Sequence, residues 1–391
     1  MRNLALLFLI LFSCETKVYK IENEYQLKIT SPKYEIYLDH LTSSFELASQ
    51  YLPVWRGEEA FAFLNRKNNE IKIYQLNTGL LSDSIQYQKD GPNGVGRIYE
   101  FHIHNEDSIF LNSKFSYRIY LINQESKILN QYYLLPKNTE FGMGGIPKGS
   151  SQTALPSMPI WHPPTLIDHF LYINSSADRD IFKPEYYDSE LIYRLNLQTG
   201  EYDYLIEYAE KYKGNVWGVG FESVYSLYNK NNYSFIFSFP IEDHIYETRD
   251  FNSFEKHVFK SSLVPEVKPM SKPTNEFSIY YKYFKSNSAY GSILYDPNRK
   301  VYFRIANLKI EDDNYNEPTN ALSNPQDFVV IVSDDSFNLI HEERFKQPKN
   351  GQYVPRMSFV NKTGLNIAFI DYDNEDKLTF VNFKLEKNDS K

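Results

Sequence analysis

The chain has 391 residues, of which 42% are hydrophobic and 16% aromatic, and this is enough to bury a sizeable core. The formal net charge of -8 offers no basic excess for a phosphate backbone, so nucleic acid is excluded as the expected partner. Cys14 is the only cysteine, which rules out an intrachain disulfide bond.

The first residues have the pattern of an export signal. A positive start, Met1–Asn3, precedes an apolar run, Leu4–Phe12, which is too short for a membrane-spanning helix of ~20 residues. Leu11–Cys14 resembles the lipobox of bacterial lipoproteins, although Phe12 stands where a small residue is usual. The resemblance implies a signal peptide over residues 1–13 and lipid attachment at Cys14, the first residue of the mature chain. An ordinary cleaved signal or a buried N-terminal strand is the alternative.

The stretch Asp90–Leu134 shows the repeating unit of the remaining chain most clearly. A loop rich in Gly and Asn precedes runs of Ile, Tyr, Phe and Leu, which suit half-buried strands. Short polar breaks of hairpin length separate these runs. The pattern predicts a four-stranded antiparallel meander, the blade of a β-propeller, with strands at Ile98–Ile103, Ser108–Leu111, Tyr117–Ile122 and Ile128–Leu134.

Five further groups of runs repeat this outline. Phe45–Val54 is ambiguous between strand and helical turn, and the long stretch Phe141–Pro164 is irregular. The predicted strands of these groups are Glu59–Leu64, Glu70–Leu76 and Leu81–Tyr87; His169–Asn174, Glu190–Asn196 and Tyr202–Tyr208; Val224–Tyr228, Tyr233–Phe239, His244–Arg249 and Glu255–Phe259; Gly291–Tyr295, Val301–Ala306, Phe328–Ser333 and Leu339–Phe345; and Arg356–Val360, Leu365–Ile370 and Leu378–Leu385.

The last group is one strand short, and the alternating run Val18–Ile29 near the chain start is spare. A propeller closes its ring by pairing an early strand with its last blade, which removes open sheet edges. We therefore predict an all-β fold: a single domain over residues 14–391 that forms a six-bladed β-propeller of four-stranded antiparallel blades, closed by an N-terminal strand. The alternative is a pair of β-sandwiches or another all-β fold.

A family resemblance rests on the lipobox, the large irregular blades and the segment Tyr295–Arg304. Together they resemble a DUF4221-like family of uncharacterised Bacteroidetes lipoproteins, a domain of unknown function expected to form six-bladed propellers. The resemblance implies a lipid-anchored location in the bacterial cell envelope, at the outer membrane. It implies no activity.

Signatures of catalysis or cofactor binding are incomplete. His102 and His104 share one face of a predicted strand, but no third metal ligand stands out beside them. Gly142–Ser150 lacks the order of a phosphate-binding loop, and the spacing of Asp312, Asn314 and Asn316 departs from an EF-hand at later positions. We therefore assign no catalytic residue, metal or cofactor, and leave open whether the protein is an enzyme.

Loops that enter the innermost strands of a propeller gather on one face, where ligands usually bind. By that analogy, the candidate ligand-binding residues are Arg97, Trp161, His162, Trp217, Tyr290 and Arg356. The resulting hypothesis is a lipid-anchored, monomeric binding or scaffold module for a polar ligand, an envelope protein or a glycan. The alternative is a hydrolase or lyase that acts on glycans or lactones in the central channel.

Overall fold

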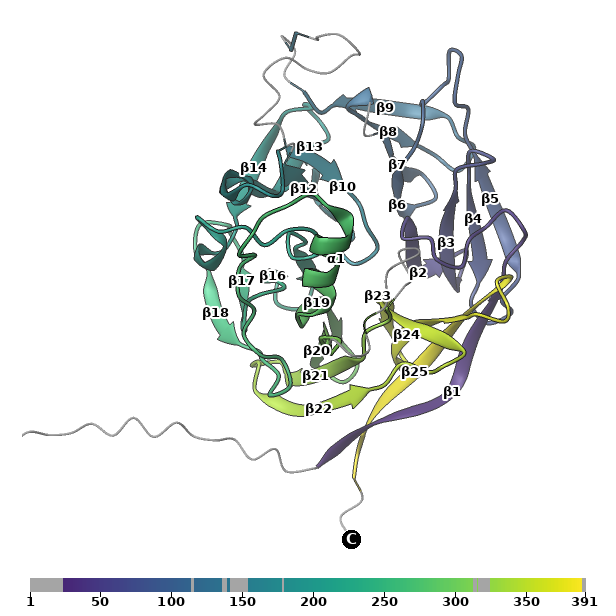
Figure 1. Ribbon diagram of the computed structural model, residues 1–391. Coiled ribbons are helices and arrows are strands. Elements are labelled where there is room, and N and C mark those ends of the chain that lie inside the picture. The colour runs from purple at the N-terminus through teal and green to yellow at the C-terminus, as the bar shows by residue number, and fades with distance from the viewer. Residues whose placement is uncertain are drawn as a thin grey trace, which may run out of the picture.

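The computed structural model describes residues 24–113, 116–135, 139–140, 154–177, 179–311, 315 and 324–388. These residues form six antiparallel sheets arranged as blades around a ring (Figure 1). Five sheets have four strands, and the third has an additional short strand. The predicted six-bladed β-propeller is confirmed.

Blades one to three are built from residues 49–207. Blade one consists of β2 (Ser49–Trp55), β3 (Glu58–Asn65), β4 (Glu70–Gln75) and β5 (Leu81–Gln86). Blade two consists of β6 (Glu100–Asn105), β7 (Ser108–Ser113), β8 (Arg118–Ile122) and β9 (Ile128–Tyr133). Blade three consists of β10 (Ala154–Ser157), β11 (Thr165–Ile167), β12 (Phe170–Ala177), β13 (Glu190–Asn196) and β14 (Tyr202–Glu207).

Blades four to six complete the ring. Blade four consists of β15 (Tyr225–Asn229), β16 (Ser234–Ser238), β17 (His244–Thr248) and β18 (Glu255–Val258), and blade five of β19 (Ala289–Asp296), β20 (Val301–Asn307), β21 (Phe328–Asp334) and β22 (Leu339–Phe345). Blade six consists of β23 (Gly351–Asn361), β24 (Gly364–Asp371), β25 (Lys377–Lys387) and β1 (Tyr25–Tyr37). In the part of the chain that the structure describes, the helical elements are α1 (Phe277–Lys285) and short 3-10 turns at Pro184–Asp188 and Glu210–Tyr212. None of these helices has the length and apolar character needed to cross a membrane.

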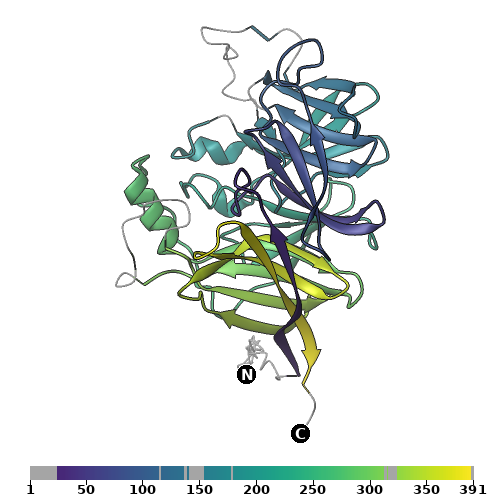
Figure 2. The same ribbon diagram turned by 90° about the vertical axis from the view of Figure 1, so that its right-hand side faces the viewer.

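The N-terminal strand closes the ring, as predicted. β1 is the outermost strand of blade six and pairs with β25, so both ends of the described chain lie in one blade (Figure 2). The predicted end at Ile29 is wrong, because β1 continues to Tyr37 across Pro32. The pairing register shifts between Thr30 and Tyr34.

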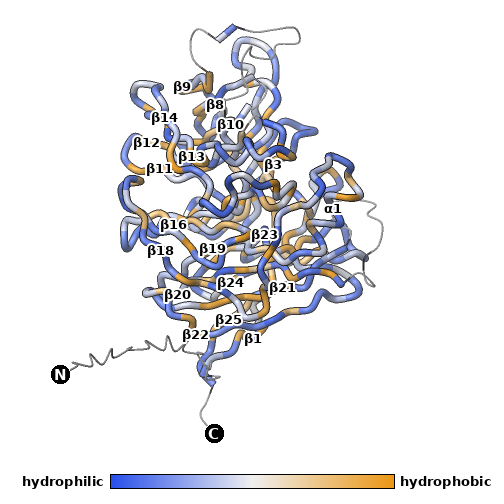
Figure 3. Tube along the Cα trace, turned by 60° about the vertical axis from the view of Figure 1, so that its left-hand side comes forward, coloured by the Kyte–Doolittle hydropathy of each residue, from blue (hydrophilic) through white to orange (hydrophobic). Residues whose placement is uncertain are grey.

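Apolar cores lie between neighbouring blades, and each blade contributes to two of them. On β3, Ala60 and Ala62 face blade two, whereas Phe61 and Phe63 face blade six. Both faces of a middle strand are thus buried, which explains its continuous apolar run, and Figure 3 shows hydrophobic segments within the blades. Full burial of one large apolar side chain contributes about 1.5–3 kcal/mol, so the six interfaces hold the ring together.

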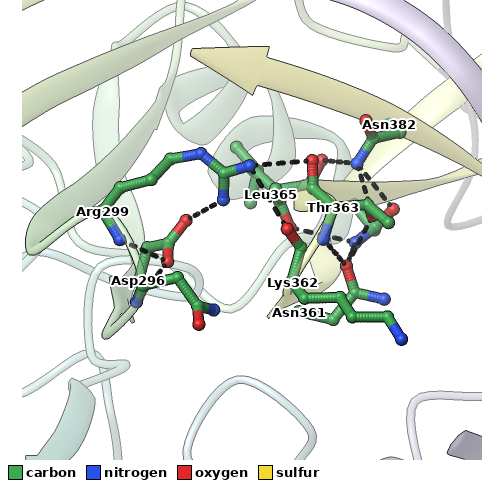
Figure 4. Close-up of polar contacts among 10 residues, drawn as sticks. Asp296, Arg299, Asn361, Lys362, Thr363, Leu365 and Asn382 are labelled. Atoms are coloured by element: carbon green, nitrogen blue, oxygen red, sulfur yellow. Dashed lines mark hydrogen bonds and ion pairs between the residues drawn. The ribbon is translucent and has the colours of Figure 1, made fainter.

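The segment that carries the family resemblance fastens blade five to blade six. Asp296 is fully buried, and its carboxylate accepts the backbone N–H groups of Asn298 and Arg299 and pairs with the Arg299 guanidinium at 2.6 Å. Nη2 of Arg299 donates to the carbonyl oxygens of Lys362 and Thr363, in the turn between β23 and β24 (Figure 4). The role of this segment in the structure is therefore to join two blades.

Candidate functional site

The inner strand of blade three is interrupted by a proline-rich loop. β10 and β11 both pair with β12, and residues 158–164 between them leave the sheet. Prolines at positions 159, 163 and 164 have no N–H group for a strand ladder, so the sequence itself prevents a continuous strand here. We call Met158–Pro164 the plug loop.

The plug loop crosses the axis of the ring. Its Met158 N–H donates to Glu100 Oε2 of blade two at 2.8 Å. Ile160 packs on the core between blades six and one, and Trp161 packs on the core between blades four and five. The guanidinium of Arg356, from blade six, lies over the Trp161 ring at 5.1 Å from its centroid. One short loop thus contacts blades on all sides of the channel and closes it.

Above the plug loop lies a cavity of about 650 Å³, which we call the channel pocket. Its walls are the inner strands β2, β6, β11, β15, β19 and β23. The lining continues past the ends of β15 and β19 to Asn231 and Pro297, so the pocket extends to the face of the ring where the inner strands end. The helix α1 stands on the other face, where these strands begin (Figures 1 and 2).

The lining of the channel pocket combines aromatic rings with uncharged polar groups. Although the chain has 50 Asp and Glu residues, none is among the described residues that line the pocket. Lys230 is its cationic side chain. The partly exposed aromatic members are Tyr51, Trp161, Tyr228 and Tyr295, whereas Phe101 and Phe359 are 3% exposed and pack in the cores between blades. The uncharged polar members include Gln50, Asn229, Asn231, Ser226, Ser292 and Ser358.

Two histidines of β6 belong to this lining. His102 is buried and burial lowers its pKa to about 3, while burial and the charge of Lys230 lower the pKa of the exposed His104. Both imidazoles are therefore neutral at pH 7 and can donate or accept hydrogen bonds. Neither belongs to a group of metal-ligating side chains in the part of the chain that the structure describes.

His162 fastens the plug loop to blade four. Its Nδ1 lies 2.6 Å from Oγ of Ser226, a residue of the pocket lining. A serine beside an imidazole has the form of an activated nucleophile, but burial lowers the pKa of His162 to about 3. An imidazole that resists protonation to this degree is a weak general base, so the contact is better explained as an anchor for the loop.

A polar cluster lies at the opposite end of the channel from the pocket mouth. Tyr225 and Glu222 raise the pKa of Arg356, so its charge is retained. Burial raises the pKa of Glu222, and burial together with Arg356 lowers the pKa of Lys285, at the end of α1, to about 8. Arg356 does not line the channel pocket. The cluster thus places cationic groups behind the Trp161 ring, out of direct reach of a ligand.

Of the six predicted residues, the structure brings Trp161, His162 and Arg356 together around the plug loop. Only Trp161 lines the channel pocket, with its ring 6.5 Å from that of Tyr225. Arg97 is exposed, and its guanidinium lies over the Tyr99 ring. Whether these residues bind a ligand stays a prediction.

The other two predicted residues are buried in packing positions. Trp217 is 1% exposed in the core between blades three and four, and its backbone N–H donates to the Tyr187 hydroxyl. The ring of Tyr290 lies 3.7 Å from the guanidinium carbon of Arg304, a fully buried residue that donates to Ser238 and to backbone carbonyl groups. Tyr290 therefore covers a buried cation, away from the pocket.

Most of the pocket lining was missed in the sequence. Tyr51, Tyr228 and Tyr295, the partly exposed tyrosines of the lining, each lie in an inner strand. A residue of an inner strand faces the channel or a neighbouring blade according to its register. The signal in the sequence was thus an aromatic residue within a first strand of a blade, rather than in the loop that enters it.

Known proteins match the chain in sequence and in fold. The model of the domain of unknown function DUF4221 matches residues 34–344. The crystal structure of a DUF4221 member from Bacteroides vulgatus ATCC 8482 is similar, with 22% identity, a TM-score of 0.77, and coverage of 94% of this chain and 99% of that one. A protein of Bacteroides fragilis NCTC 9343, described as a candidate exported protein, has 11% identity, a TM-score of 0.53, and coverage of 92% and 96%. There is no match among curated proteins. Since the family model spans most of its length, the chain belongs to the DUF4221 family.

Proposed function

We propose that this protein is a binding module that holds a sugar ring of an envelope glycan in the channel pocket. The observation that supports this is the pocket itself, closed by the plug loop and lined by aromatic rings and uncharged polar groups. Sugars present a flat C–H face that packs on aromatic rings and hydroxyl groups that need hydrogen-bond partners. The partly exposed rings of the lining offer the first, and the exposed His104 and Lys230 offer the second, in a cavity of the size usual for ligand sites.

The lining favours binding over hydrolysis. Cleavage of a glycosidic bond usually requires two carboxyl groups about 5–9.5 Å apart, and no described lining residue is Asp or Glu. The contact of Ser226 with His162 does not replace them, because His162 is a weak base. We therefore favour the binding module over the glycan or lactone enzyme.

We also propose that the protein works as a monomer anchored to the outer membrane through a lipid on Cys14. The lipobox-like segment Leu11–Cys14 supports the anchor, although it lies outside the described residues. The description of the Bacteroides fragilis relative as a candidate exported protein supports an envelope location. In this location, the pocket face of the ring would meet glycans or glycan-bearing proteins of the envelope.

The test begins with an immobilised panel of bacterial glycans, and each retained glycan is then titrated by calorimetry. His104→Ala and Lys230→Ala remove exposed groups at the pocket and leave the cores intact. We expect each to weaken binding about tenfold, the effect of one lost hydrogen bond of about 1.4 kcal/mol.

The matched controls are His40→Ala and Lys272→Ala, which remove exposed groups outside the channel pocket. They should bind as the parent does. Failure of the whole panel to bind, or equal binding by the pocket variants, would contradict the proposal.

A further inference from the structure

Three side chains that can bind a metal ion meet on the outer strands of blade four. Glu247 on β17 is directly opposite Glu255 on β18 in the strand register. His257 follows Glu255 by two positions, so all three side chains project from the same face of the sheet. This cluster lies apart from the channel pocket, whose lining includes none of these residues.

The donor atoms are close enough to share one ion. Nε2 of His257 lies 3.2 Å from Oε2 of Glu247 and 3.9 Å from Oε2 of Glu255, and the three donor atoms lie within 4.8 Å of one another. Tetrahedral coordination with bonds of about 2.0–2.1 Å separates neighbouring ligand atoms by about 3.3 Å. A small rotation of Glu255, whose side chain is 68% exposed, would bring the set to this geometry.

The burial of Glu247 gives an independent reason to expect a cation. Its side chain is only 9% exposed, and Oε1 is buried without a hydrogen-bond partner, with Arg249 Nη2 4.0 Å away. A buried carboxylate with an unsatisfied oxygen is costly. It is also directly opposite a second carboxylate, an arrangement that destabilises a strand pair unless a cation lies between them.

We propose that Glu247, Glu255 and His257 form a binding site for a divalent transition-metal ion of the zinc class. One imidazole nitrogen and two carboxylate oxygens supply three ligands, and the exposed side of Glu255 leaves a fourth position for water. The imidazole selects against Mg²⁺ and Ca²⁺, which prefer oxygen ligands. The His257 ring packs on Phe337 of blade five, 4.5 Å between centroids, and this contact holds the ring in place.

The ion would also stabilise the ring. All three ligands come from blade four, but Phe337, the support of His257, belongs to the turn between β21 and β22 of blade five. Metal binding would thus fix the outer edge of blade four against its neighbour. A ligand that binds only the folded chain raises the melting temperature.

The experiment uses the mature chain without a polyhistidine tag, stripped of metal by a chelator. Calorimetric titration with ZnCl₂ should show one site, and ZnCl₂ should raise the melting temperature, whereas MgCl₂ and CaCl₂ should not. Glu255→Gln, an exposed and isosteric change, should weaken zinc binding at least tenfold. Glu255→Gln with His257→Gln should abolish binding at the site.

The matched control is Glu266→Gln, whose side chain is 76% exposed and pairs with Lys211 elsewhere on the surface. It should bind zinc as the parent does. Zinc binding that survives both substitutions at the cluster would overturn the proposal. So would an absence of zinc binding by the folded parent.

Discussion

At the scale of single residues, the polar groups near the channel are mainly fasteners that shape the site. His162 fixes the plug loop through Ser226, and Gln50 fixes β2 to β6 by exchanging hydrogen bonds with the backbone of Ile103 at 2.8 Å each. These contacts satisfy buried groups that would otherwise be costly. The free hydrogen-bonding capacity of the pocket is thus concentrated in side chains near its mouth, such as His104 and Lys230.

The burial of His162 predicts an acid-sensitive contribution to stability. Its pKa is about 3 in the folded chain and about 6.5 when exposed, so between these values only the unfolded state binds the proton. Stability therefore falls as the pH drops below about 6.5. The contribution of this residue is about 1.4 kcal/mol per pH unit.

Urea unfolding of the parent and of His162→Gln at pH 7, 6, 5 and 4 measures this contribution. The variant keeps an acceptor for the Ser226 hydroxyl but cannot be protonated. We expect the parent to be more stable at pH 7 and its advantage to shrink by about 1.4 kcal/mol per unit below pH 6.5. His40→Gln, at an exposed position, should run parallel to the parent. A constant difference between the parent and His162→Gln would refute the assignment.

At the scale of elements, the sequence predicted regular strands well, but it did not indicate the interrupted inner strand of blade three or the helix α1. β20 and β13 were predicted almost to the residue, because each is an apolar run ended by polar turn residues. β10 and β11 are strands because both pair with β12. This pairing leaves no local pattern in the irregular stretch before β12, so the sequence did not indicate the two strands.

The helix α1 was missed for a different reason. Its residues, rich in Phe, Tyr and Ile, have β propensity, and its position depends on packing of Phe284 against Phe221. Gly220 permits this packing, because a Cβ atom there would lie 2.4 Å from the Phe284 ring and the backbone has φ of +96°. Such long-range contacts cannot be seen in a local pattern.

The strand β1 offers the sharpest test of an element. Its buried residues Leu27 and Ile36 pack on different interfaces, with blade five and blade one respectively. Removal of residues 25–37 would uncover both cores and leave the edge of β25 unpaired. We expect aggregation or a large loss of thermal stability, measured by calorimetry and light scattering.

Removal of residues 389–391, which follow the last strand, serves as the comparison and should leave the melting temperature unchanged. If the chain without β1 remained monomeric with the melting temperature of the parent, closure by this strand would not be what stabilises the ring.

At the scale of the whole molecule, the candidate site exists only because the ring closes. The pocket lining extends from Ser49 on β2 to Val360 on β23, and the plug loop from blade three forms its floor. No blade alone encloses the cavity. The sequence could therefore indicate blades and the channel, but the composition of the pocket required the register of all six inner strands.

The location of the whole molecule is the subject of the last prediction. If Cys14 carries the lipid, the ring is tied to the membrane by a short segment, because Tyr25 follows Cys14 by eleven positions. An extended chain of this length reaches at most about 40 Å, so the ring would stay near the bilayer surface. Several acyl chains on one residue hold a protein stably, whereas a single chain holds it reversibly.

We expect the full-length protein to sediment with membranes and to incorporate labelled palmitate. The Cys14→Ala variant should lose the label, and it should accumulate as an uncut precursor or appear in the soluble fraction. Cys14→Ser should behave as Cys14→Ala does, since only the thiol can accept the lipid. A Cys14→Ala protein that sediments with membranes at the size of the mature parent would show that the lipid anchor is not what holds this propeller at the envelope.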